Sequence, residues 1–200
     1  MRGKRGLLTT LIMVSLLAAP STAHADMGLP MLIIAWPGMG VMLIPVVALE
    51  VFVLMRLFGT PVGRTVEVAA TSNIVSTVVG IPVTWGILFG MQAVTGGGRG
   101  GPSVETLAGK VLAVTWQAPW LLPYESDLYW MVPVAMLVLL VPFFFASWLI
   151  EYQVSRLMMR DFAAGVVKNA VLRANLASYA LLVLVVIGAL AVGIYQRAAI

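Results

Sequence analysis

Residues 130–158, WMVPVAMLVLLVPFFFASWLIEYQVSRLM, decide the class of fold. Their only formal charges are Glu151 and Arg156, both near the end of the stretch. About 20 apolar residues in a helix are enough to cross a hydrocarbon core of about 30 Å. Lipid offers the backbone no hydrogen bonds, so a single segment can cross it only as a helix. The stretch therefore predicts a transmembrane helix.

Three further stretches have the same character, at residues 31–57, 66–94 and 171–195. Together the four predict an all-α integral membrane protein, a four-helix transmembrane bundle made of two helical hairpins. Prolines within the stretches are expected to kink the helices rather than end them, because neighbouring groups in a membrane protein satisfy the freed backbone. These prolines are Pro37, Pro45, Pro82, Pro133 and Pro142.

The composition agrees with a membrane protein. The 200 residues are 61% hydrophobic and 10% charged, with a mean hydropathy of +1.02, whereas soluble domains are about 25% charged. A disordered chain is excluded and a soluble globular enzyme is disfavoured. The chain has no cysteine and one histidine, His24, which argues against haem, zinc and copper sites and against Ser–His or Cys–His catalysis. We expect no cofactor, no metal site, no catalytic residue and no enzymatic activity.

Residues 1–25, MRGKRGLLTTLIMVSLLAAPSTAHA, have the pattern of a secretory signal peptide. A basic start precedes an apolar run that is too short to span a membrane, and Ala23 and Ala25 provide the small residues of a cleavage site. We predict cleavage after Ala25, with an uncleaved anchor as the alternative. Arg2, Lys4 and Arg5 account for three units of the formal net charge of +4. The remaining charge indicates no nucleic-acid partner.

The basic residues predict how the helices are oriented. The two short connections and their flanks carry Arg56, Arg64, Arg156, Arg160, Lys168 and Arg173, and the rest of the chain after the leader carries Arg99, Lys110 and Arg197. Cytoplasmic loops are enriched in Lys and Arg. We therefore predict a multi-pass protein of the bacterial inner (plasma) membrane, with the short connections in the cytoplasm and both termini of the mature chain extracytoplasmic. Its first partner is the lipid bilayer.

Residues 96–129 are predicted to form an extracytoplasmic loop with a short amphipathic helix. The loop begins with GGGRGG at residues 96–101, which is typical of a flexible linker. Apolar positions with helical spacing follow at Val104, Leu107, Ala108, Val111, Leu112 and Thr115. We expect this helix to lie on the outer membrane surface, with a lid over an opening between the helices as the alternative. The predicted organisation is signal peptide 1–25, first hairpin 26–95, loop 96–129 and second hairpin 130–200.

The two hairpins share a polar pattern that predicts an internal repeat. Each has a Glu and an Arg near the end of its first helix and N-x-x-S in its second: Glu50, Arg56, Asn73 and Ser76, then Glu151, Arg156, Asn175 and Ser178. Both hairpins enter the membrane from the same side, so the repeat would be parallel. Chance similarity between apolar helices is the alternative.

The repeat predicts specific contacts. Within each antiparallel hairpin the Glu and the Asn lie about equally far from the connection, so they reach the same depth on facing helices. A carboxyl group inside a membrane costs about 2.5–3.5 kcal/mol, and an amide N–H on the facing helix would offset part of that cost. We therefore expect Glu50 to approach Asn73, and Glu151 to approach Asn175, directly or through one water.

Small residues four apart predict a central packing seam, because they let helix backbones approach closely. They are Ser72, Ser76, Gly80, Gly86 and Gly90 in the second stretch and Ala170, Ala174 and Ser178 in the fourth. The candidate polar site inside the membrane comprises Glu50, Asn73, Ser76, Glu151, Asn175 and Ser178. The candidate anchors on the cytoplasmic side are Arg56, Arg64, Arg156 and Arg160.

Two functions fit these observations. The first is a structural or accessory subunit that packs with other membrane proteins or with further copies of the chain. The alternative is a transporter or channel for a small ion or solute that uses Glu50 and Glu151, because intramembrane carboxyl groups are functional candidates by default. The side chains of Arg56 and Arg156 bear on this choice. If they reach toward the carboxyl groups, each Glu would have a structural role as the partner of an arginine. Alternatively, the arginines would reach the lipid headgroups.

Overall fold

The computed structural model of the chain describes residues 29–94, 105–115, 117–118, 120–121 and 127–199. The predicted signal peptide and the glycine-rich stretch lie outside these residues. The described chain is helical apart from one pair of two-residue strands, β1 (Leu29–Pro30) and β2 (Trp120–Leu121). Four helical segments are long and apolar enough to cross a membrane, in agreement with the predicted multi-pass membrane protein.

The four spans are α2 (Met31–Phe58), the continuous run of α3 (Val62–Val75), η1 (Ser76–Gly80) and α4 (Ile81–Val94), then α6 (Leu128–Met158) and α7 (Ala164–Ala198). Two spans begin earlier than predicted, at residue 62 instead of 66 and at residue 164 instead of 171. Hydropathy identifies the part of a helix that fits lipid. A helix can continue past that part with charged side chains, as α7 does through Lys168.

The connection between α2 and α3 is a tight turn. Gly59 has a φ of +63°, and its N–H donates to the carbonyl of Met55 at 3.0 Å. A left-handed glycine of this kind ends a helix without steric cost. Pro61 then precedes α3 with a φ of −57° and a ψ of 145°. So short a connection makes α2 and α3 antiparallel neighbours.

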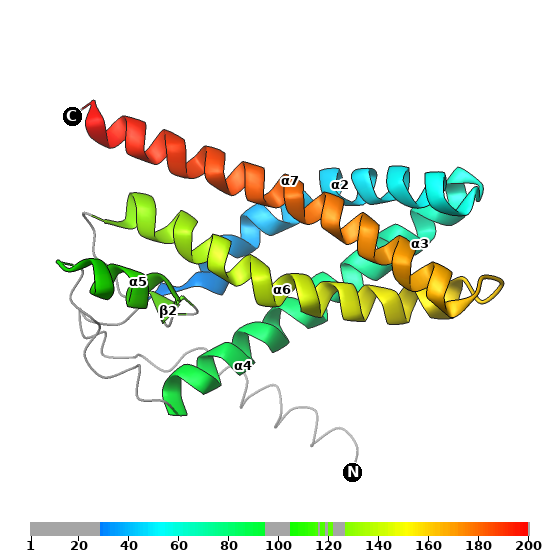
Figure 1. Ribbon diagram of the computed structural model, residues 1–200, viewed down its shortest axis with the longest axis horizontal. Helices are drawn as coiled ribbons and strands as arrows, with labels where there is room; N and C mark the ends of the chain where they lie inside the picture. The colour runs from blue at the N-terminus through cyan, green and yellow to red at the C-terminus, as the bar shows by residue number, and fades with distance from the viewer. Residues whose placement is uncertain (1–28, 95–104, 116, 119, 122–126, 200) are drawn as a thin grey trace, which may run out of the picture.

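Pro82 explains the irregular centre of the second span. Proline lacks an N–H and its ring clashes with the carbonyl four residues earlier, here that of Val78. The chain accommodates this with the π-helical turn η1, as is common at kinks. Beyond this turn α4 diverges from the other spans (Figure 1). The predicted kink is therefore present at Pro82, and α6 continues through Pro133 and Pro142, which do not end it, as predicted.

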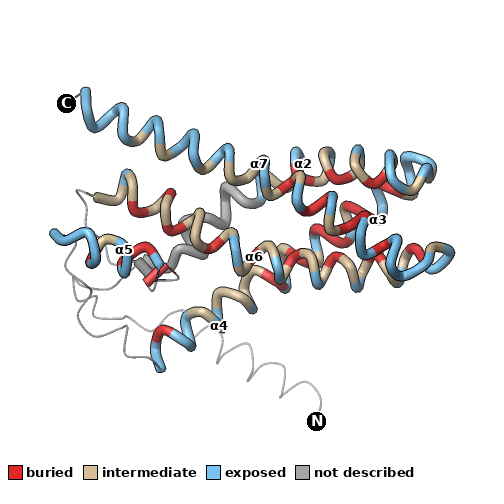
Figure 2. Tube along the Cα trace, viewed as in Figure 1, coloured by how far each residue is buried: buried red, intermediate tan, exposed pale blue. Residues whose placement is uncertain are grey.

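The four spans form a bundle in which α2 packs against α3 and α7, and α6 packs against the same two helices. Consequently α2 and α6 face each other diagonally across the bundle. We call the end that holds the α2–α3 and α6–α7 connections the turn end, and the opposite end the open end. Buried residues concentrate where the four helices meet, while the C-terminal half of α7 is largely exposed (Figure 2). Many exposed residues are large and apolar, such as Ile44 and Leu184.

The short helix α5 (Leu107–Thr115) packs against α6 near the open end (Figure 1). Its residues Ala113 and Val114 are buried in a cluster that includes Met131 and Ala135. The positions predicted to form its apolar face are the exposed ones, including Leu107, Val111 and Leu112. An apolar outward face beside the bundle is what a helix in contact with lipid requires.

The predicted packing seam is confirmed in part. Ser72, Ser76 and Gly80, and on α7 Ala170, Ala174 and Ser178, are all buried. A Cβ at Gly80 would lie 2.8 Å from Cδ1 of Ile150, so the helices approach closely there. The prediction was wrong for Gly86 and Gly90, which are exposed. Both lie beyond the kink at Pro82, where α4 leaves the bundle.

Candidate functional site

The carboxyl groups of Glu50 and Glu151 lie together in the interior of the bundle. Their side chains come from the diagonal helices α2 and α6, and they are 2% and 3% exposed. Both glutamates line the same cavity. The bundle thus brings two acidic side chains together in the interior of four apolar helices.

Each carboxyl group accepts a hydrogen bond from the Asn of its own hairpin, as predicted. Asn73 Nδ2 donates to Glu50 Oε2 at 2.5 Å, and Asn175 Nδ2 donates to Glu151 Oε2 at 2.7 Å. Each Nδ2 also donates to the carbonyl four residues earlier, that of Ala69 or Val171. Both partners of each Nδ2 are acceptors, so the orientation of each amide is fixed.

Each carboxyl group also accepts a hydrogen bond from the other hairpin. Ser178 Oγ donates to Glu50 Oε1 at 2.6 Å, and Ser76 Oγ donates to Glu151 Oε1 at 2.8 Å. The sequence placed both serines in the site but did not predict these partners. The signal lies in the N-x-x-S spacing, because a residue three positions on is turned by about 60° around the helix. The Ser therefore faces the next helix of the bundle while the Asn faces its own hairpin.

The site contains no basic side chain among the described contacts. Arg56 is exposed and lies over the ring of Phe52, with Cζ 5.0 Å from the ring centroid. Arg156 Nη1 donates to the carbonyl of Phe162 at 3.1 Å. The interpretation in which these arginines lock the carboxyl groups is therefore wrong. Both side chains are directed away from the site because Arg can reach the polar boundary of the membrane more cheaply than its interior.

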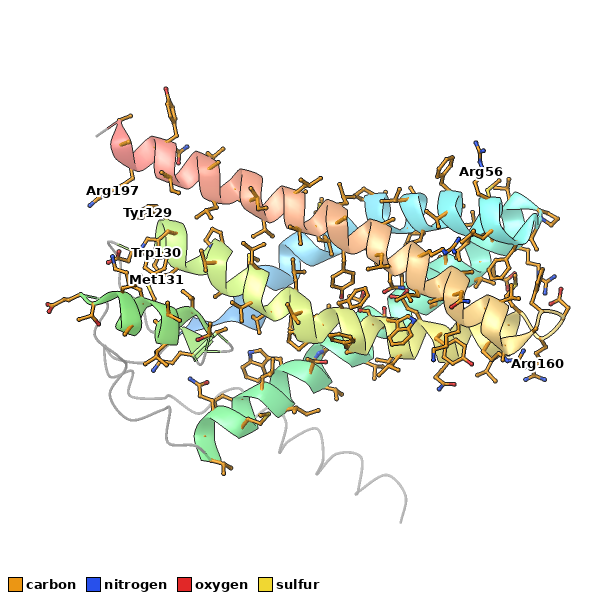
Figure 3. All side chains as sticks on the ribbon, viewed as in Figure 1. Arg56, Tyr129, Trp130, Met131, Arg160 and Arg197 are labelled. Carbon is orange, nitrogen blue, oxygen red and sulfur yellow. The ribbon has the colours of Figure 1, made fainter. Side chains whose placement is uncertain are left out.

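The four predicted anchors lie toward the turn end, and Figure 3 labels Arg56 and Arg160 there and Arg197 at the opposite end. Arg64 joins the two connections: its guanidinium forms an ion pair with Asp161 and donates to the carbonyl of Met158. Arg160 Nε donates to the carbonyl of Leu157 at 3.0 Å. The Arg64 guanidinium holds the pKa of Asp161 below its ordinary value of 3.8.

A cavity of about 80 Å³ adjoins the carboxyl pair on the side of the open end. Among the residues that line it are Val46, Ser147 and Tyr179, together with both glutamates. Tyr179 Oη donates to Ser147 Oγ at 3.0 Å. The cavity is large enough to hold water and it has polar groups to bind it.

On the side of the turn end, apolar residues close the bundle beneath the carboxyl pair. One buried cluster comprises Leu54, Ala69, Ala170 and Ala174, and a second comprises Val68, Met159, Val167 and Val171. Within the described residues, the carboxyl pair thus borders a cavity on one side and packed side chains on the other.

Comparison of the chain with protein families, with curated proteins and with solved structures finds no match.

Proposed function

We propose that the chain transfers protons across the membrane and that Glu50 and Glu151 bind the proton. The two carboxyl groups are buried, border one cavity and have no basic side chain as a partner among the described residues, and this arrangement carries the proposal. Two adjacent carboxylates cannot both stay ionised in an apolar site. Because no arginine neutralises the negative charge of the pair, a bound cation has to do so. The proton is the smallest such cation.

The hydrogen bonds to the carboxyl groups support release as well as binding. Every carboxyl oxygen accepts one donor, from Asn73 and Ser178 for Glu50 and from Asn175 and Ser76 for Glu151. These donors stabilise the negative charge that remains when a proton leaves. A site that can hold a proton and then tolerate its loss is what transfer requires.

The surroundings of the carboxyl pair also support transport. The cavity lies on the open-end side of the pair, while the two apolar clusters pack on its turn-end side. With the predicted orientation the open end is extracytoplasmic. In this conformation a proton would arrive from outside, and release inward would need the turn end to loosen.

We propose that the two hairpins are a parallel internal repeat. In each, the Glu contacts the Asn of its own hairpin and the Ser of the other, so that three matched positions make four equivalent hydrogen bonds. Two equivalent halves that share one site in the middle of the membrane are a common arrangement in transporters.

A structural or accessory subunit is the second candidate function. The observation in its favour is that the hydrogen bonds of the carboxyl groups connect α2, α3, α6 and α7, so they could serve as a permanent fastening of the bundle. The two functions differ in whether the charge is needed, because glutamine can keep many of these hydrogen bonds without a charge.

Proton flux into liposomes distinguishes the two. Purified protein is reconstituted with an internal pH-sensitive dye, and a pH step is applied across the membrane. Glu50→Gln and Glu151→Gln should each abolish flux. Glu67→Gln is the matched control, because Glu67 lies exposed on α3, outside the site, and it should leave flux unchanged. Equal flux in all variants, or none above protein-free liposomes in the parent chain, would overturn the proposed function in favour of the structural one.

A further inference from the structure

The two halves of the site differ one helical turn beyond the carboxyl groups, toward the turn end. On α2 the residue four positions after Glu50 is Leu54, whereas on α6 the residue four positions after Glu151 is Ser155. The residue just before the Asn of the site also differs between the halves: it is the apolar Ala174 on α7 and the polar Ser72 on α3. One side beneath the pair is therefore apolar and the other carries two hydroxyl groups.

The apolar side is closed. Leu54 is 2% exposed and packs with Ala69, Ala170 and Ala174 in a single buried cluster. These side chains carry no group that could accept or donate a proton.

The polar side carries a hydroxyl group with no partner. Ser155 is 1% exposed, and its Oγ makes no hydrogen bond. A buried hydroxyl without a partner is unfavourable, and alanine would avoid that cost. Residues four apart share a helix face, and side chains lean toward the helix N-terminus. Ser155 therefore lies on the same face of α6 as Glu151.

Ser72 offers a second hydroxyl on the facing helix. It is 2% exposed, and its Oγ donates to the carbonyl of Ala69 at 3.2 Å, so its oxygen is free to accept. Val68 lies four residues before Ser72, and Met159 lies four residues after Ser155. Val68 and Met159 belong to the same buried cluster, so α3 and α6 face each other at this level.

We infer that protons leave the Glu50–Glu151 pair toward the turn end between α3 and α6, with Ser155 as the first relay residue and Ser72 beside it. This inference rests on the proposed function. In the step, the protonated carboxyl group of Glu151 gives its proton to the Ser155 oxygen through a water molecule, because the Ser155 hydroxyl has no direct hydrogen bond. The hydroxyl proton of Ser155 passes on to the Ser72 oxygen or to a further water molecule, so serine ends neutral. A second proton that reaches Glu50 from the cavity as the first one leaves keeps the two carboxyl groups from being ionised together.

Val68 and Met159 form the layer that closes this route. They are 2% and 1% exposed and lie one turn beyond the two serines. Further toward the turn end, Thr65 Oγ1 lies 2.9 Å from Thr60 Oγ1, and Thr60 is partly exposed. Parting of the valine and the methionine would join the serines to these hydroxyl groups.

A matched pair of substitutions tests the relay in the liposome flux assay. Ser155→Thr keeps the hydroxyl group, and Ser155→Val has the same shape without it. We expect Ser155→Thr to retain most of the flux and Ser155→Val to lose it severalfold or more. If Glu151→Gln abolishes flux but the threonine and valine variants carry equal flux, the relay is wrong while the proposed function stands. If Glu151→Gln leaves flux unchanged, the proposed function fails.

A second measurement does not depend on flux. The chain has no cysteine, so Ser155→Cys and Leu54→Cys place single thiols at the same level of the two halves. In everted membrane vesicles, a small methanethiosulfonate reagent added from the turn side should modify the thiol at position 155 faster than the one at position 54, because parting of Val68 and Met159 uncovers the first thiol and leaves the second closed. Equal reactivity of the two, or faster reaction at position 54, would contradict a route between α3 and α6. Monodisperse elution of each variant in detergent checks that it folds.

Discussion

At the scale of single residues, the support of each carboxyl group is divided between two hairpins, and this decides what its replacement does. Glu50→Gln still offers Asn73 an oxygen, and Ser178 can turn its hydroxyl to accept from the new amide. Glu50→Leu leaves one N–H of Asn73 buried without an acceptor, because the other already donates to Ala69. We expect Glu50→Leu to be less stable than Glu50→Gln by about 1–3 kcal/mol.

Thermal unfolding in detergent, followed by tryptophan fluorescence, measures this difference. Glu151→Gln and Glu151→Leu should show the same order, because Asn175 has the equivalent partners. A leucine variant as stable as its glutamine counterpart would mean that the amide does not depend on the carboxyl group.

The residue scale also shows which parts of the site the sequence could predict. The pairing of each Glu with the Asn of its own hairpin could be predicted, because the two residues lie equally far along the chain from the short connection between their helices. The pairing of Ser76 with Glu151 and of Ser178 with Glu50 depends on how the two hairpins dock. The periodicity within a hairpin carries no information about that docking. Nothing in the sequence of α6 alone distinguishes Ser155, because its significance depends on the contrast with Leu54 at the matched position of α2.

At the scale of helices, one close approach holds the open end of α6 against α7. A Cβ at Gly193 would lie 2.9 Å from the carbonyl oxygen of Tyr129, whereas a Cβ at Gly188 would meet nothing within 4 Å. A backbone oxygen cannot move aside as a flexible side chain can. We therefore expect Gly193→Ala to lower the unfolding temperature.

Gly188→Ala is the control on the same helix, and it should be neutral or stabilising by up to about 1 kcal/mol, because alanine favours a helix over glycine. Both melting temperatures are measured in the same detergent. Similar shifts for the two variants would show that the contact with Tyr129 does not matter for stability.

The two connections are held together by an exposed ion pair, and its contribution should depend on pH. The pKa of Asp161 is lowered in the folded protein by Arg64. Its contribution to stability is therefore present above the ordinary value of 3.8 and is lost as the pH falls below it. The side chains are 39% and 51% exposed, so the effect is small and is screened by salt.

We expect Asp161→Asn to melt at a slightly lower temperature than the parent chain at neutral pH and low salt. The gap should narrow in acid and at high salt. Melting curves over a pH series give the comparison. If the difference in melting temperature between the two proteins is the same at every pH, it does not arise from the charge on Asp161.

The sequence predicts that the four helices exist, but it predicts only part of how they pack. The four spans follow from hydropathy, because lipid demands an apolar surface over a fixed length. The seam at Ser72, Ser76 and Gly80 followed from small residues four apart, but the same rule failed at Gly86 and Gly90. The rule assumes one continuous helix, and the kink at Pro82 turns the later part away.

At the scale of the whole molecule, the two ends of the bundle differ in charge, and this predicts sidedness. Asn169 is exposed near the turn end, and Leu107 is 79% exposed on α5 near the open end. Because the apolar face of α5 would lie against lipid, the exposed polar residue Thr106, just before α5, is the better reporter for that end. We expect Thr106→Cys to react with an impermeant thiol reagent that reaches the periplasm of intact cells, and Asn169→Cys to react only after the inner membrane is opened. The reverse pattern would invert the predicted orientation and with it the direction of proton transfer.

The contact between Ser178 and Glu50 joins residues 128 positions apart, and this has a consequence for the making of the protein. The first hairpin is synthesised and inserted before the second exists. In that interval Glu50 has Asn73 as its only partner within the site, and a carboxyl group in this state is costly in lipid. A nascent chain that stalls or is cut before α7 carries in the bilayer an acidic group that lacks one of its hydrogen-bond donors. Helix α7 thus completes the support of a carboxyl group that was inserted with the first hairpin.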